Sequence, residues 1–263
     1  MPPITPGYIS RSISRAQRLS VRFRERLRGM SLRAAQRGQG WPIPPSHLIY
    51  LVAGTEDVGW FLDSGAVAAQ VLDEVLARNG IAIDRLGSIL DFGCGVGRVI
   101  RHLSHLQGPQ LYGTDYNPKL LSWCQRHLPF AQFYGNSLQR GAGFRAESFD
   151  LVYALSIFTH LTEPLQAYWI DELARILRPG GHLLLTVHGD SYLPSLSPAE
   201  RDRFRAGELV VQRSERPGSN DCAAFHPPSY VRSTFARGLT VADFIAEGAR
   251  GNPHQDVYLL RKP

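Results

Sequence analysis

The chain has 263 residues, 29 basic and 23 acidic side chains and a formal net charge of +6. A chain of this length can bury the core of one domain with additions. No run of about 20 apolar residues occurs, so we expect no membrane-spanning helix. The three cysteines, Cys94, Cys124 and Cys222, lack metal-ligand spacing, which predicts reduced thiols in a cytoplasmic protein and no metal site.

The positive charge is confined to one segment. Residues 10–37 hold nine arginines and one glutamate, a net charge of +8, which leaves 20 basic and 22 acidic residues and a net charge of −2 for the rest. The basicity of the chain is therefore no evidence that the active site of the remaining domain takes nucleic acid. We interpret residues 1–40 as a basic arginine-rich segment that is a disordered tail, an amphipathic helix touching a membrane surface or a partner, or an organelle transit peptide.

Residues 41–80 are expected to be helical. A stiff proline-rich stretch, 41–45, precedes a helix near 46–52, and a second helix is expected over about 66–78, where apolar residues recur on one side. We interpret this region as an N-terminal helical cap on a domain that spans residues 81–263.

The segment Asp91–Val99 has the most informative pattern in the chain. The apolar run Ser88–Leu90 leads into an acidic residue and then three glycines at alternate positions. Glycine permits positive φ and close approach of the backbone to a ligand. Helical spacing then follows over 98–107, so the pattern predicts strand, glycine loop and helix, as in nucleotide-binding α/β units.

The spacing of the glycines narrows the choice of nucleotide. A dinucleotide fingerprint needs glycine or alanine three residues after its second glycine, but Arg98 and Ile100 stand there, and no Gly-Lys-Ser/Thr of a phosphate-binding loop is present. The remaining pattern, acid-x-Gly-x-Gly-x-Gly, resembles motif I of the class I S-adenosylmethionine (SAM)-dependent methyltransferases. An acidic Asp91 is suited to a cationic ligand and unsuited to a pyrophosphate.

The following segments agree with this resemblance in order. A strand over 110–115 ends in Asp115, a strand over 131–135 precedes Asn136, and the strand 148–154 matches the family's Phe-Asp-x-Val pattern. Leu177–Gly181 matches its turn into a fifth strand, 182–187, where Pro179 ends the helix and Gly180 is expected as its left-handed cap. Asn117 and Pro118 open the helix between the second and third strands.

The resemblance implies a Rossmann-like, doubly wound α/β fold. Its sheet has seven strands in the order 3-2-1-4-5-7-6, with the last strand antiparallel, and the closing strands are expected at 239–245 and 256–260. It implies that Asp115 binds the ribose hydroxyls, that Tyr116 lies against the adenine and that Asn136 reads the adenine amino group. The expected cofactor-binding residues are Asp91, Phe92, Gly93, Cys94, Gly95, Gly97, Asp115, Tyr116, Asn136, Ser137 and Ala154.

The chain departs from the minimal fold between residues 189 and 226. This insert is expected to hold a short helix over 198–205, a strand-like segment at 208–212 and a polar loop, with a further helix over 228–237 beyond it. A stretch of this length is more often functional than idle. We expect the acceptor between the insert and the N-terminal helices, where Trp60, Phe61 and Tyr192 are candidate substrate contacts; ordinary packing is the alternative for the first two.

Three histidines are candidates for a general base, because they follow strand ends, where open α/β sheets bind their ligands. His160 follows the fourth strand, His188 ends the fifth and His226 precedes the late helix. A base assists a hydroxyl nucleophile and matters little for a neutral amine.

Missing motifs favour a small-molecule acceptor. Ala154–Ile157 stands where the enzymes that methylate adenine or glutamine amino groups carry Asn/Asp-Pro-Pro-aromatic, and no Pro-Cys nucleophile is present. We therefore expect SAM-dependent methylation of a small metabolite, sugar or natural product, with oxygen preferred over nitrogen. The alternatives are an RNA or protein methyltransferase that uses the basic N-terminal segment, and a SAM-binding protein that transfers no methyl group.

Overall fold

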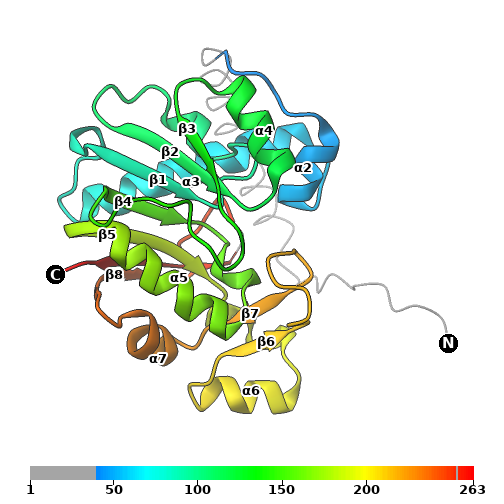
Figure 1. Ribbon diagram of the computed structural model, residues 1–263. Helices are drawn as coiled ribbons and strands as arrows, with labels where there is room; N and C mark the ends of the chain where they lie inside the picture. The colour runs from blue at the N-terminus through cyan, green and yellow to red at the C-terminus, as the bar shows by residue number, and fades with distance from the viewer. Residues whose placement is uncertain (1–39, 253) are drawn as a thin grey trace, which may run out of the picture. The chain divides into compact units, whose positions relative to one another are not determined.

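The computed structural model of the chain describes residues 40–252 and 254–263 (Figure 1). The predicted basic segment, residues 1–40, lies outside these residues except for Gly40, so its predicted roles stay predictions. Within the part of the chain that is described, no helix is both long enough and apolar enough to cross a bilayer.

Seven strands form one sheet in the order β3-β2-β1-β4-β5-β9-β8, which confirms the expected topology. The parallel strands are β1 (Ser88–Phe92), β2 (Gln110–Asp115), β3 (Gln132–Gly135), β4 (Phe149–Ala154) and β5 (Leu177–Val187). β9 (Asp256–Arg261) runs antiparallel to β5, and β8 (Thr240–Ile245) runs antiparallel to β9. All carboxyl ends of the first five strands therefore meet at one edge.

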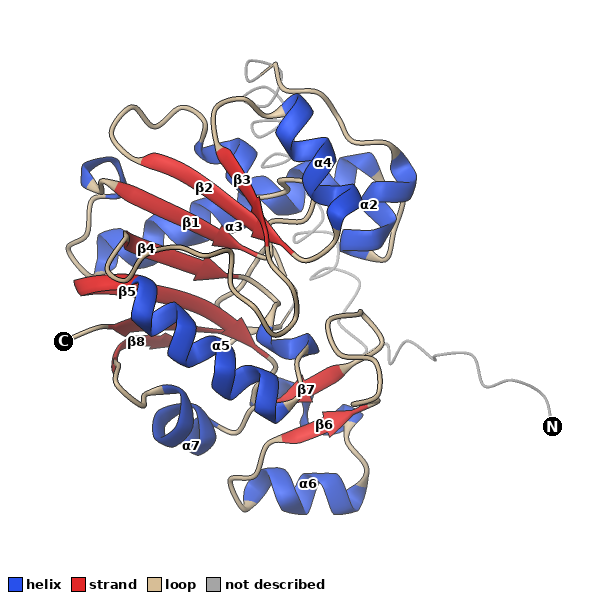
Figure 2. Cartoon of the chain, in the orientation of Figure 1, coloured by secondary structure: helices blue, strands red, loops and turns tan. Residues whose placement is uncertain are grey.

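Helices cover both faces of the sheet (Figures 1 and 2). One core contains side chains of α2 (Ser46–Ala53), α3 (Val58–Arg78) and α4 (Pro118–His127), and the other contains those of α5 (Glu163–Ile176) and α7 (Pro228–Tyr230). Strand alternation divides neighbours between them, since Ile89 belongs to the first core and Leu90 to the second. The sheet is thus buried on both sides, as parallel sheets require.

The helix α3 begins eight residues earlier than the expected residue 66, at Val58. Asp57 caps it, because its Oδ1 accepts a hydrogen bond from the Trp60 backbone at 3.0 Å. Gly65 lies inside this helix for a steric reason: a Cβ there would be 2.1 Å from the carbonyl oxygen of Arg98. Glycines at 59 and 65 weakened the helical pattern, but the second marks a close contact rather than a helix boundary.

The segment after the glycine loop is not the regular helix predicted over 98–107. It is a run of turns with one short 3₁₀ helix, Ile100–Leu103, in which His102 donates its backbone N–H to Val99. Val99, Ile100 and Leu103 are buried as predicted and Leu106 is half-buried, and α3 approaches the segment closely at Gly65. Periodicity predicted the burial correctly and the backbone incorrectly.

The turn into β5 also differs from its prediction. The helix α5 ends at Ile176 with Leu177 as its cap, and β5 already begins at Leu177. Gly180 does have a positive φ of 78°, but it lies within an irregular stretch of β5. The prediction that Gly180 caps the helix is therefore wrong, whereas the prediction of its left-handed conformation is confirmed.

The insert forms a small unit with its own core (Figure 2). It comprises a 3₁₀ helix (Asp190–Ser195), α6 (Pro198–Arg205), and the antiparallel strands β6 (Val210–Gln212) and β7 (Ala223–Phe225). Ser197 and Glu200 form a capping box at the start of α6, which confirms that predicted helix. The expected late helix is short, because α7 passes into a π-helical turn, Val231–Phe235; a 3₁₀ turn, Ile83–Arg85, precedes β1.

Candidate active site

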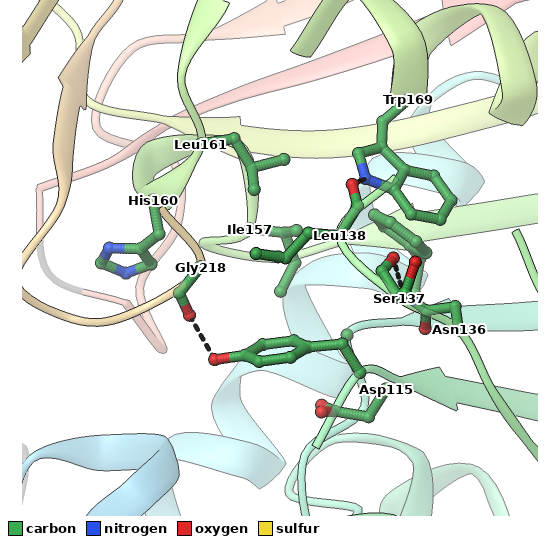
Figure 3. Close-up of a pocket in the computed structure, with 12 residues that line it drawn as sticks. Asp115, Asn136, Ser137, Leu138, Ile157, His160, Leu161, Trp169 and Gly218 are labelled. Atoms are coloured by element: carbon green, nitrogen blue, oxygen red, sulfur yellow. Dashed lines mark hydrogen bonds between the residues drawn. The ribbon is translucent and has the colours of Figure 1, made fainter. Parts of the chain in front are cut away.

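A pocket lies at the carboxyl ends of β1 to β4, on both sides of the point where the strand order reverses (Figure 3). This is the position at which open α/β sheets bind ligands. Seven of the predicted site residues line it: Phe92, Gly93, Asp115, Tyr116, Asn136, Ser137 and His160. It is also lined by Leu138, Ile157, Leu161, Trp169 and Gly218, which were not predicted.

Asp115 ends β2 with its carboxylate on the pocket wall. Its Oδ2 accepts a hydrogen bond from the Gly95 backbone at 2.9 Å, and its Oδ1 accepts one from Asn117 at 2.7 Å. Burial raises the pKa of Asp115, and backbone hydrogen bonds oppose that rise. A carboxylate has about four acceptor positions, so each oxygen retains one for a hydroxyl group.

The opposite end of the pocket combines an apolar slot with one unpaired acceptor. Trp169 of α5 donates its Nε1–H to the carbonyl of Leu138 at 2.8 Å, which fixes the segment after β3. Asn136 donates Nδ2–H to Ser137 at 3.0 Å, whereas its Oδ1 is buried without a partner. A buried acceptor of this kind favours a ligand that donates a hydrogen bond, such as an exocyclic amino group.

The glycine loop is built as a close-packed turn. Gly93, Gly95 and Gly97 all have positive φ, at 80°, 55° and 73°. A Cβ on Gly93 would lie 2.1 Å from Cδ1 of Ile157, and one on Gly97 would lie 2.4 Å from Cδ1 of Leu128. Gly93 lines the pocket, whereas the other two glycines lie against protein side chains.

Asp91, Cys94 and Ala154 lie behind the loop rather than in the pocket wall. Asp91 is buried near Tyr153 and Arg98, and its burial raises its pKa to about 7, opposed chiefly by the neighbouring Tyr153 hydroxyl and by the charge of Arg98. Cys94 and Ala154 are also buried. The surroundings of Asp91 therefore point to a role in shaping the loop.

His160 lines the pocket, and one of its ring nitrogens has no hydrogen-bond partner among the described residues. Its Nδ1 lies 2.8 Å from the carbonyl oxygen of Cys222. Because a carbonyl can only accept, Nδ1 carries the proton and Nε2 keeps its lone pair. Burial lowers the pKa of His160, so the ring is neutral at pH 7. It is the candidate base that the structure supports best.

His188 is engaged on both ring nitrogens. Nδ1 lies 3.1 Å from the Ala224 carbonyl, and Nε2 lies 3.4 Å from the amide nitrogen of Gln255. That amide is oriented by Thr186, whose Oγ1 accepts from the Ser156 backbone and donates to Gln255 Oε1 at 2.6 Å. Burial lowers the pKa of His188 to about 4. These contacts favour a role for His188 in joining the end of β5 to β7 and to the residue before β9.

The burial of His226 argues against its predicted role as a base. The side chain is fully buried, and burial lowers its pKa to about 3. Its Nε2 lies 3.1 Å from Oε1 of Gln166, whose Nε2 donates to the carbonyls of Phe158 and Leu161. His226 therefore stabilises the 3₁₀ turn Phe158–His160 that carries the preceding candidate.

The predicted substrate contacts fall into two groups. Phe61 is fully buried against Arg101, whose guanidinium lies 5.3 Å from the ring centre, which is a packing role. Trp60 is 38% exposed, with the Arg98 guanidinium 5.9 Å from its ring centre. Tyr192 stacks on His188 with ring centres 4.1 Å apart. Only Trp60 and Tyr192 retain surface that an acceptor can touch.

Across the described ranges, 40–252 and 254–263, no group of three or more His, Cys, Asp or Glu side chains is arranged to hold a metal ion.

A search of protein families matches residues 90–185 to a model described as a methyltransferase domain. That stretch contains the glycine loop, Asp115, Asn136 and His160. Residues 90–185 form a SAM-dependent methyltransferase domain.

The curated relatives match about half of this chain. A mitochondrial ubiquinone biosynthesis O-methyltransferase from Dictyostelium discoideum is 26% identical over 49% of this chain and 44% of its own length. Phthiotriol/phenolphthiotriol dimycocerosates methyltransferase 1 of Mycobacterium ulcerans is 33% identical over 49% of this chain and 46% of its own. The matches thus span less than half the length of either relative.

Solved structures share the fold of the methyltransferase domain. The 1,6-didemethyltoxoflavin-N1-methyltransferase of Burkholderia thailandensis, solved with 1,6-didemethyltoxoflavin and S-adenosylhomocysteine, superposes with a TM-score of 0.55. The match covers 82% of this chain and 85% of that one at 18% identity. At this identity the likeness establishes the fold, which confirms the Rossmann-like expectation.

Proposed function

We propose that the protein transfers a methyl group from SAM to a small-molecule acceptor, with oxygen as the target atom. The observation that carries the proposal is the neutral ring of His160, a residue that lines the candidate cofactor pocket and whose Nε2 is unprotonated because Nδ1–H donates to the Cys222 carbonyl. A positioned base of this kind helps a hydroxyl nucleophile most.

The pocket fits SAM group by group. Asp115 offers acceptor positions to the two ribose hydroxyls, and the unpaired Oδ1 of Asn136 suits the adenine amino group. Phe92, Leu138 and Trp169 provide apolar surface for the adenine ring. Gly93 lines the pocket with a positive φ and no Cβ, so its backbone can approach a ligand closely.

When bound, SAM supplies a methyl group on a sulfonium centre that leaves as a neutral thioether. The residues of this chain then bind and orient the two reactants, which is worth roughly 7–11 kcal/mol of barrier in well-oriented systems. His160 receives the acceptor's hydroxyl proton at Nε2 while Nδ1–H stays bonded to Cys222. Ser156, two residues after β4, has a strained φ of 61°. Hydrogen bonds to Thr186 and Gln255 hold it there, and backbone strain of this kind is typical of functional sites.

The relatives support a small acceptor and leave both target atoms represented. One is named for O-methylation in ubiquinone biosynthesis, and one solved neighbour for N1-methylation of 1,6-didemethyltoxoflavin. Our preference for oxygen therefore depends on His160.

All three cysteines are free and buried, which supports the cytoplasm, the compartment predicted from the sequence.

Two experiments test the proposal. Calorimetry with S-adenosylhomocysteine should show binding by the full chain, and no binding would refute a SAM site. A screen with methyl-labelled SAM over phenols, sugars, carboxylic acids and amines should give transfer to a hydroxyl compound. Transfer to amines alone would overturn the oxygen assignment, and transfer to RNA or protein alone would favour the first alternative.

A further inference from the structure

The insert reaches the cofactor pocket through the backbone of Gly218. The hydroxyl of Tyr116 donates a hydrogen bond to the Gly218 carbonyl at 2.8 Å, and the Gly218 N–H donates to the His160 carbonyl at 2.7 Å. Figure 3 shows Gly218 next to His160, on the side of the pocket away from Asn136 and Ser137. A loop more than 100 residues beyond Tyr116 thus completes the wall of the pocket.

The residue at this contact has to be glycine. Gly218 has a φ of 80°, and a Cβ there would lie 2.7 Å from Cδ2 of Leu138 and 3.5 Å from the ring of Tyr116. A side chain would therefore push the loop away from the pocket or occupy space beside the ligand.

The loop 213–222 has the features of a movable element. It begins at Arg213, a non-glycine residue with a φ of 50°, where β6 has just ended. Arg216 and Asp221 pair across it at 2.6 Å, with side chains 64% and 47% exposed, so the loop is closed on itself. Its far end returns to the site at Cys222, the acceptor for His160 Nδ1. The loop can therefore swing as a unit between its two attachments.

We propose that residues 213–222 form a latch that closes over the cofactor pocket and is fastened by the hydroxyl of Tyr116. The latch opens to admit SAM and, when closed, slows its release. The inference rests on the proposed function, because it needs a nucleoside ligand in this pocket. Burial and the charge of Asp115 raise the pKa of Tyr116, so its hydroxyl remains a donor at physiological pH.

The latch also positions the proposed base. Both the backbone carbonyl and the ring Nδ1 of His160 bond to the loop, through Gly218 N–H and the Cys222 carbonyl. Closing the latch over the cofactor therefore orients Nε2 for the acceptor's proton. Opening it releases the Gly218 bond while buried Cys222, directly before β7, stays in place, so the base is held at both points only when the cofactor is covered.

The test measures how fast S-adenosylhomocysteine leaves the full-length protein. Trp169, which lines the pocket, supplies the fluorescence signal in a stopped-flow displacement experiment. Tyr116→Phe keeps the ring and removes the fastening hydrogen bond, and we expect dissociation to be about two- to tenfold faster, as one neutral hydrogen bond predicts. Tyr134→Phe is the matched control, because its hydroxyl bonds only to Gln132 on the exposed edge strand and its loss should leave the rate unchanged.

A second variant tests the close approach. Gly218→Ala should weaken binding of S-adenosylhomocysteine by more than tenfold, whereas Gly238→Ala, which has a similar φ of 77° but nothing within 4 Å of its Cβ, should leave binding unchanged. If Gly218→Ala fails to fold by thermal melting, the tyrosine variant decides. A wild-type rate in Tyr116→Phe would overturn the latch. Absence of binding by the wild-type protein would instead overturn the proposed function, and the latch with it.

Discussion

The two walls of the pocket were built in different ways. The cofactor wall comes from strand ends that are close in sequence to their functional residues: Gly93 follows β1, Asp115 ends β2 and Asn136 follows β3. The insert wall comes from Gly218 and is supported by the carbonyls of Cys222, directly before β7, and Ala224, within β7, which bond to histidines 62 and 36 residues away. The first wall follows from the fold, whereas the second is an addition that the fold does not require.

This difference suggests a division of labour. The cofactor wall offers fixed acceptors, Asp115 and Asn136, that suit a ligand common to many enzymes. The insert wall bonds to the ring of His160 through the Cys222 carbonyl. Tyr192 of the insert packs against the ring of His188. Changes to the first wall should therefore act on cofactor affinity, and changes to the second should act on the chemical step and on acceptor choice.

The largest effect is expected at His160. Replacement by asparagine keeps a side-chain N–H that can bond to the Cys222 carbonyl but removes the lone pair at Nε2. We expect kcat to fall by about 10²–10⁴-fold, the contribution of a general base, while the affinity for S-adenosylhomocysteine changes less than twofold. Steady-state kinetics on the acceptor found by the screen, with calorimetry beside it, checks both. An unchanged kcat would show that the insert wall supplies no base.

The corresponding change on the cofactor wall is Asp115→Asn. The amide loses the charge and one acceptor, and it leaves one of the N–H groups of Gly95 and Asn117 without its partner. We expect the affinity for S-adenosylhomocysteine to fall about ten- to a hundredfold, as for a charged hydrogen bond. Asp73→Asn, on the exposed face of α3, is the control and should bind as the wild type does. Equal affinities in both variants would contradict the ribose assignment.

The same division explains what the sequence could reveal. Glycine spacing and acids at strand ends are local signals, so the sheet order and seven of the pocket residues were predictable. Trp169 and Leu138 line the pocket because α5 packs across the sheet, and no local pattern marks such a contact. His226 looked accessible because it precedes a helix, but the pairing of β7 buries it. Gly218 stood in a polar loop without any pattern to distinguish it.

Acid should destabilise the second wall more than the first. Burial lowers the pKa of His188 to about 4 and that of His226 to about 3, below the value near 6.5 of an unfolded chain. As pH falls from 6.5 toward 4, the unfolded state takes up protons that the folded state refuses, so stability falls. Asp91, with its pKa raised to about 7, acts in the opposite direction, as do Asp115 and Asp256, whose pKa values burial also raises. His102, with its pKa lowered to about 4, adds to the loss.

Thermal melting between pH 7 and pH 4.5 measures this balance. We expect the melting temperature of the wild type to fall with acidification, at roughly 2–4 °C for each kcal/mol lost. His226→Gln can still donate to Gln166 but does not titrate, so its melting temperature should depend less on pH. His105→Gln, at an exposed position, should follow the wild type. An unaltered slope in His226→Gln would mean that this histidine is not the origin of the acid sensitivity.

The smallest effect is expected from the basic N-terminal segment. Every described residue that lines the pocket lies between 92 and 218, and residues 41–263 carry a formal charge of −2 despite the chain's net +6. Deletion of residues 1–38 should therefore change the affinity for S-adenosylhomocysteine less than twofold. Raising salt from 50 to 200 mM should also leave methyl transfer to a neutral small molecule unchanged, since no phosphate contacts are broken. A steep loss of activity with rising salt in the full chain, but not in the variant without residues 1–38, would contradict this prediction. It would instead indicate that the arginines bind an RNA acceptor, and the pocket would then act on a polyanionic substrate.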